Sequence, residues 1–292
     1  MSIIVVDIGG TEIKSGMFTN GNVTQIKNHL TNAKDGAKEV LTTVQTIIES
    51  YKGADAIGIC TTGQVDVDKG RVSFAGPNIP GYQGLEIKKN LVERFGIPVT
   101  VENDVNAAAI GEGQFGAGVG VNDFLCLTYG TGIGGAIILN GQLLRGTHYA
   151  AGEFGGILVH PEARNKRDIF SGCYERYASV SALIAEAKKI DEALQSGRDI
   201  CKRMNEEAVE KLINAWIQEI SIGLITLIHL FDPKQIILGG GIMEQDFIVR
   251  EVEKSVKNGV MECYKDIKIC KTRLGNLAGL YGMGYLTGSK LW

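Results

Sequence analysis

Residues 129–141 read YGTGIGGAIILNG, and residues 9–21 read GGTEIKSGMFTNG. Aligned without a gap, the two segments share the pairs Gly10/Gly130, Thr11/Thr131, Ile13/Ile133, Asn20/Asn140 and Gly21/Gly141. Each segment follows a short apolar run and continues as an apolar strand that ends in Asn-Gly, which is a strong signal for a β-hairpin. The chain therefore contains one strand–glycine turn–strand unit twice, and this repeat predicts a duplicated architecture.

The residue types in these two turns suit an anion. Glycine permits positive φ and close backbone approach, so that successive N–H groups can converge on a phosphate. A threonine hydroxyl adds a further donor. One such turn alone would be interpreted as an ordinary tight hairpin. Two turns with threonine at the same place favour a polyphosphate held between them across a cleft.

Composition excludes several classes of protein. The chain has 292 residues, of which 44% are hydrophobic and 22% charged, and its formal net charge is −3. This length allows two domains, and the charge gives no electrostatic case for nucleic acid or an acidic membrane surface. The six cysteines are scattered with no CxxC pair, which predicts reduced thiols. There is no signal peptide and no apolar run of about 20 residues, so we expect a cytoplasmic protein.

Strand and helix patterns alternate along the chain. Strands are predicted at 3–7, 13–18, 23–27, 56–60, 98–101 and 235–238, and helices at 38–50, 85–95, 106–112, 208–231 and 276–287. Such alternation predicts an α/β fold with crossover connections. No Pro- or Ser-rich linker is present, so we expect a hinge near residues 104–115. The predicted domains are 1–110, completed by the C-terminal helix 276–292, and 111–275.

Six short motifs then occur in order along the whole chain. They are DIGGT at 7–11, NIPG at 78–81, ENDVNAA at 102–108, GTGIGG at 130–135, AGEFG at 151–155 and LGGG at 238–241. Together they resemble the ROK family, which groups bacterial sugar kinases with related repressors. The resemblance implies a two-domain actin-like (ribonuclease H-like) sugar-kinase fold with a duplicated βββαβαβα core.

The resemblance also implies an activity and a set of site residues. The activity is ATP-dependent transfer of the γ-phosphoryl group to the 6-hydroxyl of a hexose or hexose derivative, a β-glucoside, N-acetylmannosamine or glucose, with Mg²⁺ as cofactor. Homodimers are common in the family. By position, Asp104 is the catalytic base, and Asp7 lies near the Mg²⁺–ATP complex, which it contacts through water. The residues expected to contact the nucleotide are Gly9, Gly10, Thr11, Gly130, Thr131, Gly132 and Gly240. The residues expected to contact the sugar are Gly63, Asn78, Asn103, Glu153 and Glu175.

The chemistry of these residue types agrees with the resemblance. Phosphoryl transfer to a hydroxyl needs positioning, charge neutralisation and one carboxylate that accepts the hydroxyl proton. Asp104 at a strand end, beside Asn103, meets the last requirement. The alternative for Asp104 is a helix N-cap, worth about 1 kcal/mol. The alternative for Asp7 is a strand-end turn former.

One departure from the family pattern concerns zinc. Family members place a His after Gly-Glu-x-Gly and bind a structural zinc with that His and three Cys. Here Gly156 stands at the His position, and only Cys173 remains of the cysteines. One thiol cannot make a tetrahedral site, so no zinc is expected. Because Gly156 offers no side chain, we expect tolerance for bulk at C1 or C2 of the sugar, unless His160 or Tyr149 fills the space.

Three other functions are alternatives. Residues 130–135 match the dinucleotide fingerprint G-x-G-x-x-G, but that fingerprint must open a helix. The following residues read as a hairpin strand, so an NAD-dependent oxidoreductase is disfavoured. A repressor of the ROK family would need a DNA-binding module before the first turn, and Gly9 leaves no room for one. A non-catalytic sugar-binding regulator stays an alternative.

Overall fold

The computed structural model describes residues 1–291, and the chain forms two compact units. Unit 1 contains Met1–Val119, Leu143–Ala151 and Asn276–Trp292, and unit 2 contains Gly120–Gln142 and Gly152–Gly275. The predicted domain boundary at residue 110 falls inside the helix α3 (Asp104–Phe115), whereas the units divide after Val119. The segment Leu143–Ala151 belongs to unit 1 although both of its neighbours in sequence belong to unit 2.

Unit 1 is built on a five-stranded sheet of order β3-β2-β1-β4-β7. Its strands are β1 (Ser2–Ile8), β2 (Glu12–Thr19), β3 (Asn22–Leu30), β4 (Ala56–Thr61) and β7 (Val99–Asn103). β1, β4 and β7 are parallel, and β2 and β3 add antiparallel to one side. A separate hairpin consists of β5 (Gln64–Asp66) and β6 (Arg71–Phe74).

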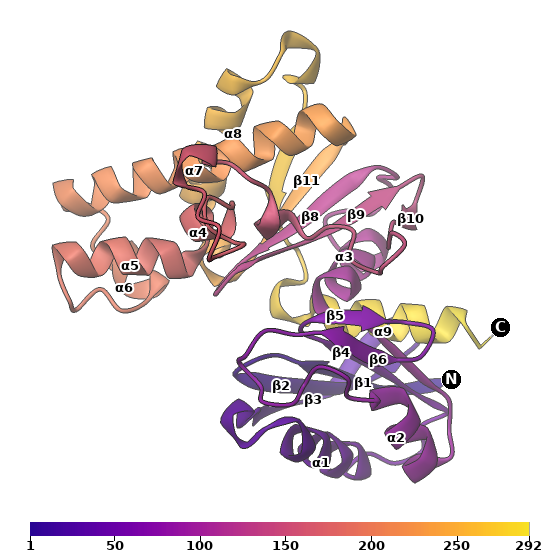
Figure 1. Cartoon of the computed structure of the whole chain (residues 1–292). Coiled ribbons are helices and arrows are strands. Elements are labelled where there is room, and N and C mark those ends of the chain that lie inside the picture. Colours follow the sequence, from indigo (N-terminus) through magenta and orange to yellow (C-terminus); the bar gives the residue numbers. More distant parts are fainter. Residues whose placement is uncertain (292) are drawn as a thin grey trace. The chain divides into compact units, whose positions relative to one another are not determined.

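Helices cover both faces of this sheet (Figure 1). α1 (Ala37–Glu49) and α2 (Ile87–Phe95) pack on the face that receives Ile4 and Val6, and α9 (Ala278–Ser289) packs on the face that receives Ile3 and Val5. Since consecutive strand residues point to opposite faces, a strand with helices on both sides is apolar throughout. This explains the uninterrupted apolar run of β1.

α3 and α9 approach each other through glycine. A Cβ atom added at Gly282 would lie 1.8 Å from the Ala107 carbonyl oxygen, and one added at Gly111 would lie 2.2 Å from that of Ala278. No larger residue fits at either position, so the small residues of the last helix allow the two backbones to touch. α3 also follows β7 directly, so this packing fixes the helix that begins at Asp104.

Unit 2 has the corresponding sheet, of order β10-β9-β8-β11-β12. Its strands are β8 (Phe124–Tyr129), β9 (Ile133–Leu139), β10 (Gln142–Leu143), β11 (Gln235–Gly239) and β12 (Lys268–Lys271). Its helices are α4 (Glu175–Ala178), α5 (Val180–Ile190), α6 (Gly197–Lys202), α7 (Glu207–Phe231) and α8 (Asp246–Gly259). Short 3₁₀ turns complete the chain at Ala33–Asp35, Phe154–Gly156, Pro161–Ala163, Gly241–Glu244, Glu262–Tyr264 and Gly275–Leu277.

The two sheets confirm the predicted duplication. In both, the first two strands form an antiparallel hairpin, and the two later strands add parallel to the first. The second strand of each sheet, β2 or β9, is followed by an Asn-Gly pair in the left-handed region. The φ values are 51° at Asn20 and 80° at Gly21, and 51° at Asn140 and 72° at Gly141. Positive φ at both central residues is the signature of the type I′ hairpin turn.

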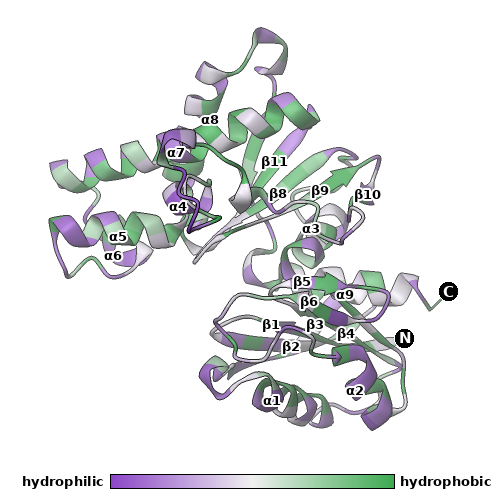
Figure 2. Cartoon of the chain, viewed as in Figure 1, coloured by the Kyte–Doolittle hydropathy of each residue, from purple (hydrophilic) through white to green (hydrophobic). Residues whose placement is uncertain are grey.

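α7 is the longest helix of the part that the structure describes. By length and composition alone it could span a bilayer, but half of its most apolar stretch is buried inside the protein. Figure 2 shows hydrophobic residues along much of α7 and along the strands of both sheets. A helix that is apolar on most sides and packed in this way is typical of a protein core.

Candidate functional site

The two glycine turns have matching geometry. The Gly9 N–H donates to the Glu12 carbonyl, and the Gly130 N–H donates to the Gly132 carbonyl, both at 3.0 Å. Thr11 and Thr131 are exposed. Open space surrounds the positions that Cβ atoms would take at Gly10 and Gly130, so both turns can be approached closely.

The use of positive φ at these turns is not confirmed. Positive φ occurs at other glycines among residues 1–291, but not at Gly9, Gly10, Gly130 or Gly132. The glycines serve instead to keep side chains away. A Cβ at Gly9 would lie 2.9 Å from the Glu12 carbonyl oxygen, inside the tight bend itself.

Asp7 follows the buried run Ile3–Val6 of β1 and is half-buried. In the sheet it is paired with Lys14 of β2 and Cys60 of β4. Burial raises the pKa of Asp7, and the Lys14 charge and a hydrogen bond from the Cys60 thiol offset part of that rise. Gly279 at the start of α9 lies against this pair, because a Cβ there would lie 3.0 Å from Sγ of Cys60 and 3.5 Å from Oδ2 of Asp7.

Asn103, and not Asp104, caps α3. Its side-chain oxygen accepts hydrogen bonds from the backbone N–H groups of Val105 (2.9 Å) and Asn106 (3.0 Å). Its amide nitrogen donates to the Gly63 carbonyl (3.0 Å) and to Oδ1 of Asp104 (2.8 Å). Both donors of the amide and both lone pairs of its oxygen are thus engaged. The N-cap alternative for Asp104 is wrong, because its neighbour performs that role.

Asp104 is a perturbed carboxylic acid. Burial, and next the negative charge of Asp7, raise its pKa to about 7. Hydrogen bonds from the Val105 N–H and the Asn103 amide favour the charged form and limit the rise. A carboxyl group poised near neutral pH can accept or release a proton under physiological conditions, which is typical of a general base.

In unit 2, Glu175 lies against the glycine turn. A Cβ added at Gly132 would be 2.8 Å from Oε2 of Glu175, and one added at Gly155 would be 3.0 Å from the same oxygen. The absence of a side chain at both positions leaves the space that this carboxylate occupies, and at Gly155 the Ile133 carbonyl oxygen is closer still, at 2.7 Å. The structure brings together the turn predicted to bind phosphate and a carboxylate predicted to bind sugar.

Gly240, the residue after β11, lies against Tyr129, the residue before the same turn. Its φ is 107°, and a Cβ there would lie 2.1 Å from the carbonyl oxygen of Tyr129. Glu153 is exposed and precedes the 3₁₀ turn Phe154–Gly156. Nothing lies within 4 Å of the position that a Cβ would take at Gly156, so the space in front of this glycine is open.

Hydrogen bonds to other protein groups hold the loop that contains His160 and Cys173. His160 contacts Oε1 of Glu162 (3.0 Å) and Oε2 of Glu219 (2.9 Å) and stacks on Tyr177. The buried Cys173 thiol donates to the Ile169 carbonyl at 3.6 Å. Among residues 1–291, no group of three or more His, Cys, Asp or Glu side chains is arranged to hold a metal ion. These residues do not fit a zinc site.

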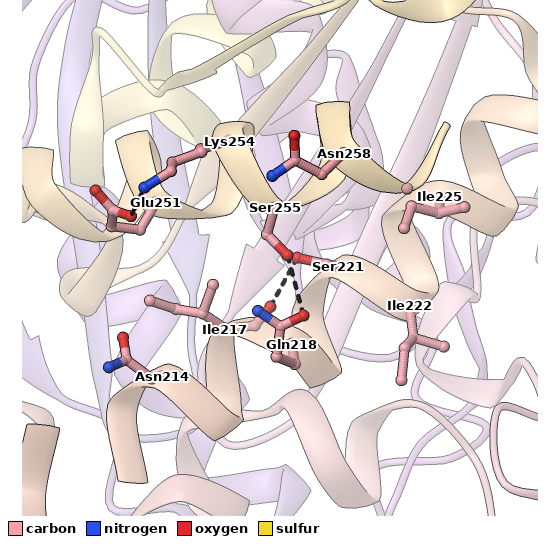
Figure 3. Close-up of a pocket in the computed structure, with 11 residues that line it drawn as sticks. Asn214, Ile217, Gln218, Ser221, Ile222, Ile225, Glu251, Lys254, Ser255 and Asn258 are labelled. Atoms are coloured by element: carbon pink, nitrogen blue, oxygen red, sulfur yellow. Dashed lines mark hydrogen bonds and ion pairs between the residues drawn. The ribbon is translucent and has the colours of Figure 1, made fainter. Parts of the chain in front are cut away.

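A surface pocket of about 420 Å³ lies between α7 and α8 (Figure 3). Its walls carry Ser255, which donates to Gln218, and the ion pair of Glu251 with Lys254. None of the site residues predicted from the sequence lines this pocket. It therefore contributes nothing to the candidate site.

The remaining predicted residues fall into two groups. Gly63, with φ of 88°, is joined to Asn103 as described, whereas Asn78 is exposed in the loop between β6 and α2. The sequence interpretation missed Cys60, which faces Asp7, and the pair Glu102–Arg145 behind Asn103. A glutamate inside the apolar run of β7 was the available signal, because an unpaired charge is not buried there.

Comparison with known proteins identifies the family of the chain. The model of the ROK family matches residues 3–290. A β-glucoside kinase of Listeria innocua is 30% identical, with 96% of this chain and 97% of the relative covered. A Listeria monocytogenes protein provisionally named an N-acetylmannosamine kinase has a TM-score of 0.90 at 28% identity, with full coverage of both chains.

A third relative was solved with ligands. The ROK glucokinase of Streptomyces griseus, in complex with glucose and AMPPNP, has a TM-score of 0.86 at 32% identity, with 98% of this chain and 99% of that chain covered. The predicted actin-like sugar-kinase fold is thereby confirmed, and so is the exclusion of a dinucleotide fingerprint, since residues 133–139 form the strand β9. The chain belongs to the ROK family.

Proposed function

We propose that this sugar kinase transfers the γ-phosphoryl group of ATP to the 6-hydroxyl of a hexose or hexose derivative. Its relatives include kinases of glucose and of β-glucosides, and one was solved with an ATP analogue. The observation that carries the proposal is the environment of Asp104, a half-buried carboxyl group of raised pKa. Asn103, and not Asp104, serves as the helix cap.

Asp104 acts as the general base. Its hydrogen bonds from Asn103 and Val105 both reach Oδ1, which leaves Oδ2 to accept the proton of the sugar hydroxyl. Removing that proton as the oxygen attacks phosphorus contributes about 10²–10⁴-fold to such reactions. The base needs only a modest driving force, because the transition state is loose and charge stabilisation dominates.

The nucleotide is held by the two turns and by Gly240. Thr11 and Thr131 donate their hydroxyl hydrogens to phosphate oxygens, and the open space at Gly10 and Gly130 admits those phosphates. Asp7 is the carboxylate that would hold Mg²⁺ through water, and it fits because it stands half-buried at the end of β1, two residues before the turn. The cation would supply charge neutralisation for the phosphates.

The sugar is oriented by Glu153, Glu175, Asn78 and Asn103. Asn103 has no spare hydrogen-bonding capacity, so it binds a hydroxyl only by giving up the Gly63 carbonyl or Asp104. Exchange with Gly63 leaves Asp104 oriented, and this fits the proposal that Gly63 also contacts the sugar.

Open space at Gly156 supports a substrate with a bulky group at C1 or C2. The two side chains that could have filled it are engaged elsewhere: His160 with Glu162 and Glu219, and Tyr149 with Asp68. A site without a polar partner discriminates weakly between hydroxyl patterns, and added volume admits a larger substituent. We therefore favour a β-glucoside or an N-acetylhexosamine over glucose.

The test is sugar-dependent ADP release measured for glucose, cellobiose, N-acetylmannosamine and N-acetylglucosamine, with the product position read by NMR. A kcat/KM at least equal to that for glucose with one of the larger sugars, and phosphate on O6, is the expected result. A preference for glucose of about 100-fold, equivalent to about 2.7 kcal/mol, would rule out the open pocket. Sugar binding without ADP release from any sugar would identify a non-catalytic regulator.

A further inference from the structure

Glu102 is a buried carboxylate directly behind the proposed base. It lies in β7, only 1% exposed, one residue before Asn103. Oε1 accepts hydrogen bonds from the Asn103 N–H (3.0 Å) and from the Asn106 side-chain amide (3.1 Å). Oε2 accepts two from Arg145, from Nε at 3.0 Å and from Nη2 at 2.8 Å.

These contacts fix both sides of the strand-to-helix corner. One goes to the peptide N–H that precedes Asp104, and the other to the first turn of α3. The side-chain oxygen of Asn106 is buried without a hydrogen-bond partner, so this side chain is held through its amide hydrogens on Glu102. The orientation of Glu102 therefore decides the position of the corner that carries Asn103 and Asp104.

Arg145 is what holds Glu102. Two guanidinium nitrogens converge on one carboxylate oxygen, Oε2, and hydrogen bonds between charged groups are shorter and stronger than those between neutral groups. Arg145 comes from the strap, defined here as Leu143–Ala151, the segment of unit 1 inserted between two parts of unit 2. The strap closes on itself through a hydrogen bond from the Ala151 N–H to the Arg145 carbonyl.

A second anchor holds the strap at its other end. The Tyr149 hydroxyl donates to Asp68 in the β5–β6 turn. Tyr149 has a φ of 56°, which is unfavourable for an aromatic residue and persists only where the surrounding structure imposes it. Two attachments and one strained residue show that the strap has a defined position in unit 1.

We propose that Arg145 is a positioning residue for phosphoryl transfer: through Glu102 it sets the place of Asn103 and Asp104. This inference rests on the proposed function of Asp104 as base. Arg145 touches neither substrate in the proposal. Its effect travels through two hydrogen bonds to Glu102 and from there through one to the backbone of Asn103.

The test compares Arg145→Met and Arg145→Lys with a matched control, Arg94→Met. Arg94 also contacts a glutamate of unit 1, Glu49, through two nitrogens, but both side chains are exposed. A misplacement of about 1 Å at a reacting group costs up to about 100-fold. Arg145→Met should therefore lower kcat by about 10- to 100-fold, Arg145→Lys should recover part of the loss, and Arg94→Met should match wild type.

Further readouts separate positioning from folding. The KM for ATP should stay within about twofold of wild type in the folded Arg145 variants, because the nucleotide contacts lie elsewhere. The double variant Glu102→Gln/Arg145→Met should lose no more kcat than the worse single variant, since both substitutions break the same contact between Arg145 and Glu102. A merely structural role would lower the thermal midpoint and leave kcat unchanged at temperatures well below it.

The outcomes are distinct. Folded Arg145→Met with kcat and sugar KM within twofold of wild type overturns the inference. If Arg145→Met does not fold, Arg145→Lys is judged by the same criterion, because lysine keeps the charge and loses the fork. A wild-type enzyme that releases no ADP with any sugar refutes the proposed function instead, and that result is visible before any variant is made.

Discussion

The two five-stranded sheets share one strand order and differ in what stands at the ends of their parallel strands. In unit 1, Asp7 lies near the end of β1, after the buried run Ile3–Val6, and Asp104 follows β7. At the matching places in unit 2 stand Leu127 in β8 and Thr272 after β12. The scaffold is duplicated, but the acids are not. A fold positions side chains, and the chemistry depends on which side chains it is given.

This difference divides the proposed work. Unit 1 carries two carboxyl groups of raised pKa, Asp7 and Asp104. In both, burial is the main cause of the rise. Unit 2 carries a glycine turn with Glu175 and Gly240 packed against it. We propose that unit 1 handles the proton and the cation, while unit 2 contributes anion and hydroxyl contacts. The following predictions test this division.

The largest effect is expected at Asp104. Asp104→Asn keeps the shape of the side chain and removes the base, so kcat should fall by about 10²–10⁴-fold, or roughly 3–5 kcal/mol of barrier. The sugar KM should change little. Asp35→Asn, an exposed aspartate of the same unit, is the control. Turnover of Asp104→Asn within a few-fold of wild type would contradict the assignment.

The pH dependence should follow the raised pKa of Asp104, about 7. A base must be deprotonated, so kcat/KM should rise about tenfold per pH unit below that value and level off above it. Steady-state rates between pH 5 and 9 measure this. A profile that is flat between pH 5.5 and 8 would exclude Asp104 as the titrating base.

Stability should change with pH in the opposite direction. Because the folded pKa of Asp104 lies above the ordinary aspartate pKa of 3.8, the folded state holds the proton more tightly. The favourable contribution is complete below 3.8 and is lost as pH rises to about 7. Asp104→Asn lacks this titration, so its thermal midpoint should fall less than that of wild type between pH 5 and pH 8. Equal shifts would contradict the sign.

The two turns should respond alike if both hold phosphates. Thr11→Val and Thr131→Val each remove one hydroxyl donor and keep the volume, which costs about 0.5–1.5 kcal/mol for a neutral hydrogen bond and more for a charged partner. We expect the KM for ATP to rise about 3- to 30-fold in each variant. Thr19→Val in β2 serves as the control. An effect in only one turn would mean that the other is a structural hairpin.

The smallest expected effect is that of chelators. The Cys173 thiol donates a hydrogen bond to a backbone carbonyl, and His160 contacts two carboxylates. Protein groups therefore hold both side chains in place, and no metal is needed for this. Prolonged treatment with EDTA, followed by Mg²⁺ and ATP, should leave activity and thermal midpoint unchanged. About one zinc per chain by elemental analysis would overturn this expectation.

The sequence by itself determined the duplicated hairpins, the α/β alternation and the family. These features are local, because glycine, Asn-Gly and apolar periodicity act within a few residues of each other. It also marked Asp104, although it could not separate a base from a helix cap. Only the tertiary structure showed that Asn103 is the cap, because that requires hydrogen-bond geometry at the corner.

Long-range contacts were decided by the fold alone. Glu102 and Arg145 are 43 residues apart, and no local pattern pairs them. Glu175 and Gly132 are also distant in sequence, yet the carboxylate lies against the glycine, in the space that a side chain there would take. The same holds for the strap, which belongs to unit 1 while its chain neighbours belong to unit 2. Burial, partner and charge environment arise only when separate strands come together, and these set the pKa of Asp104.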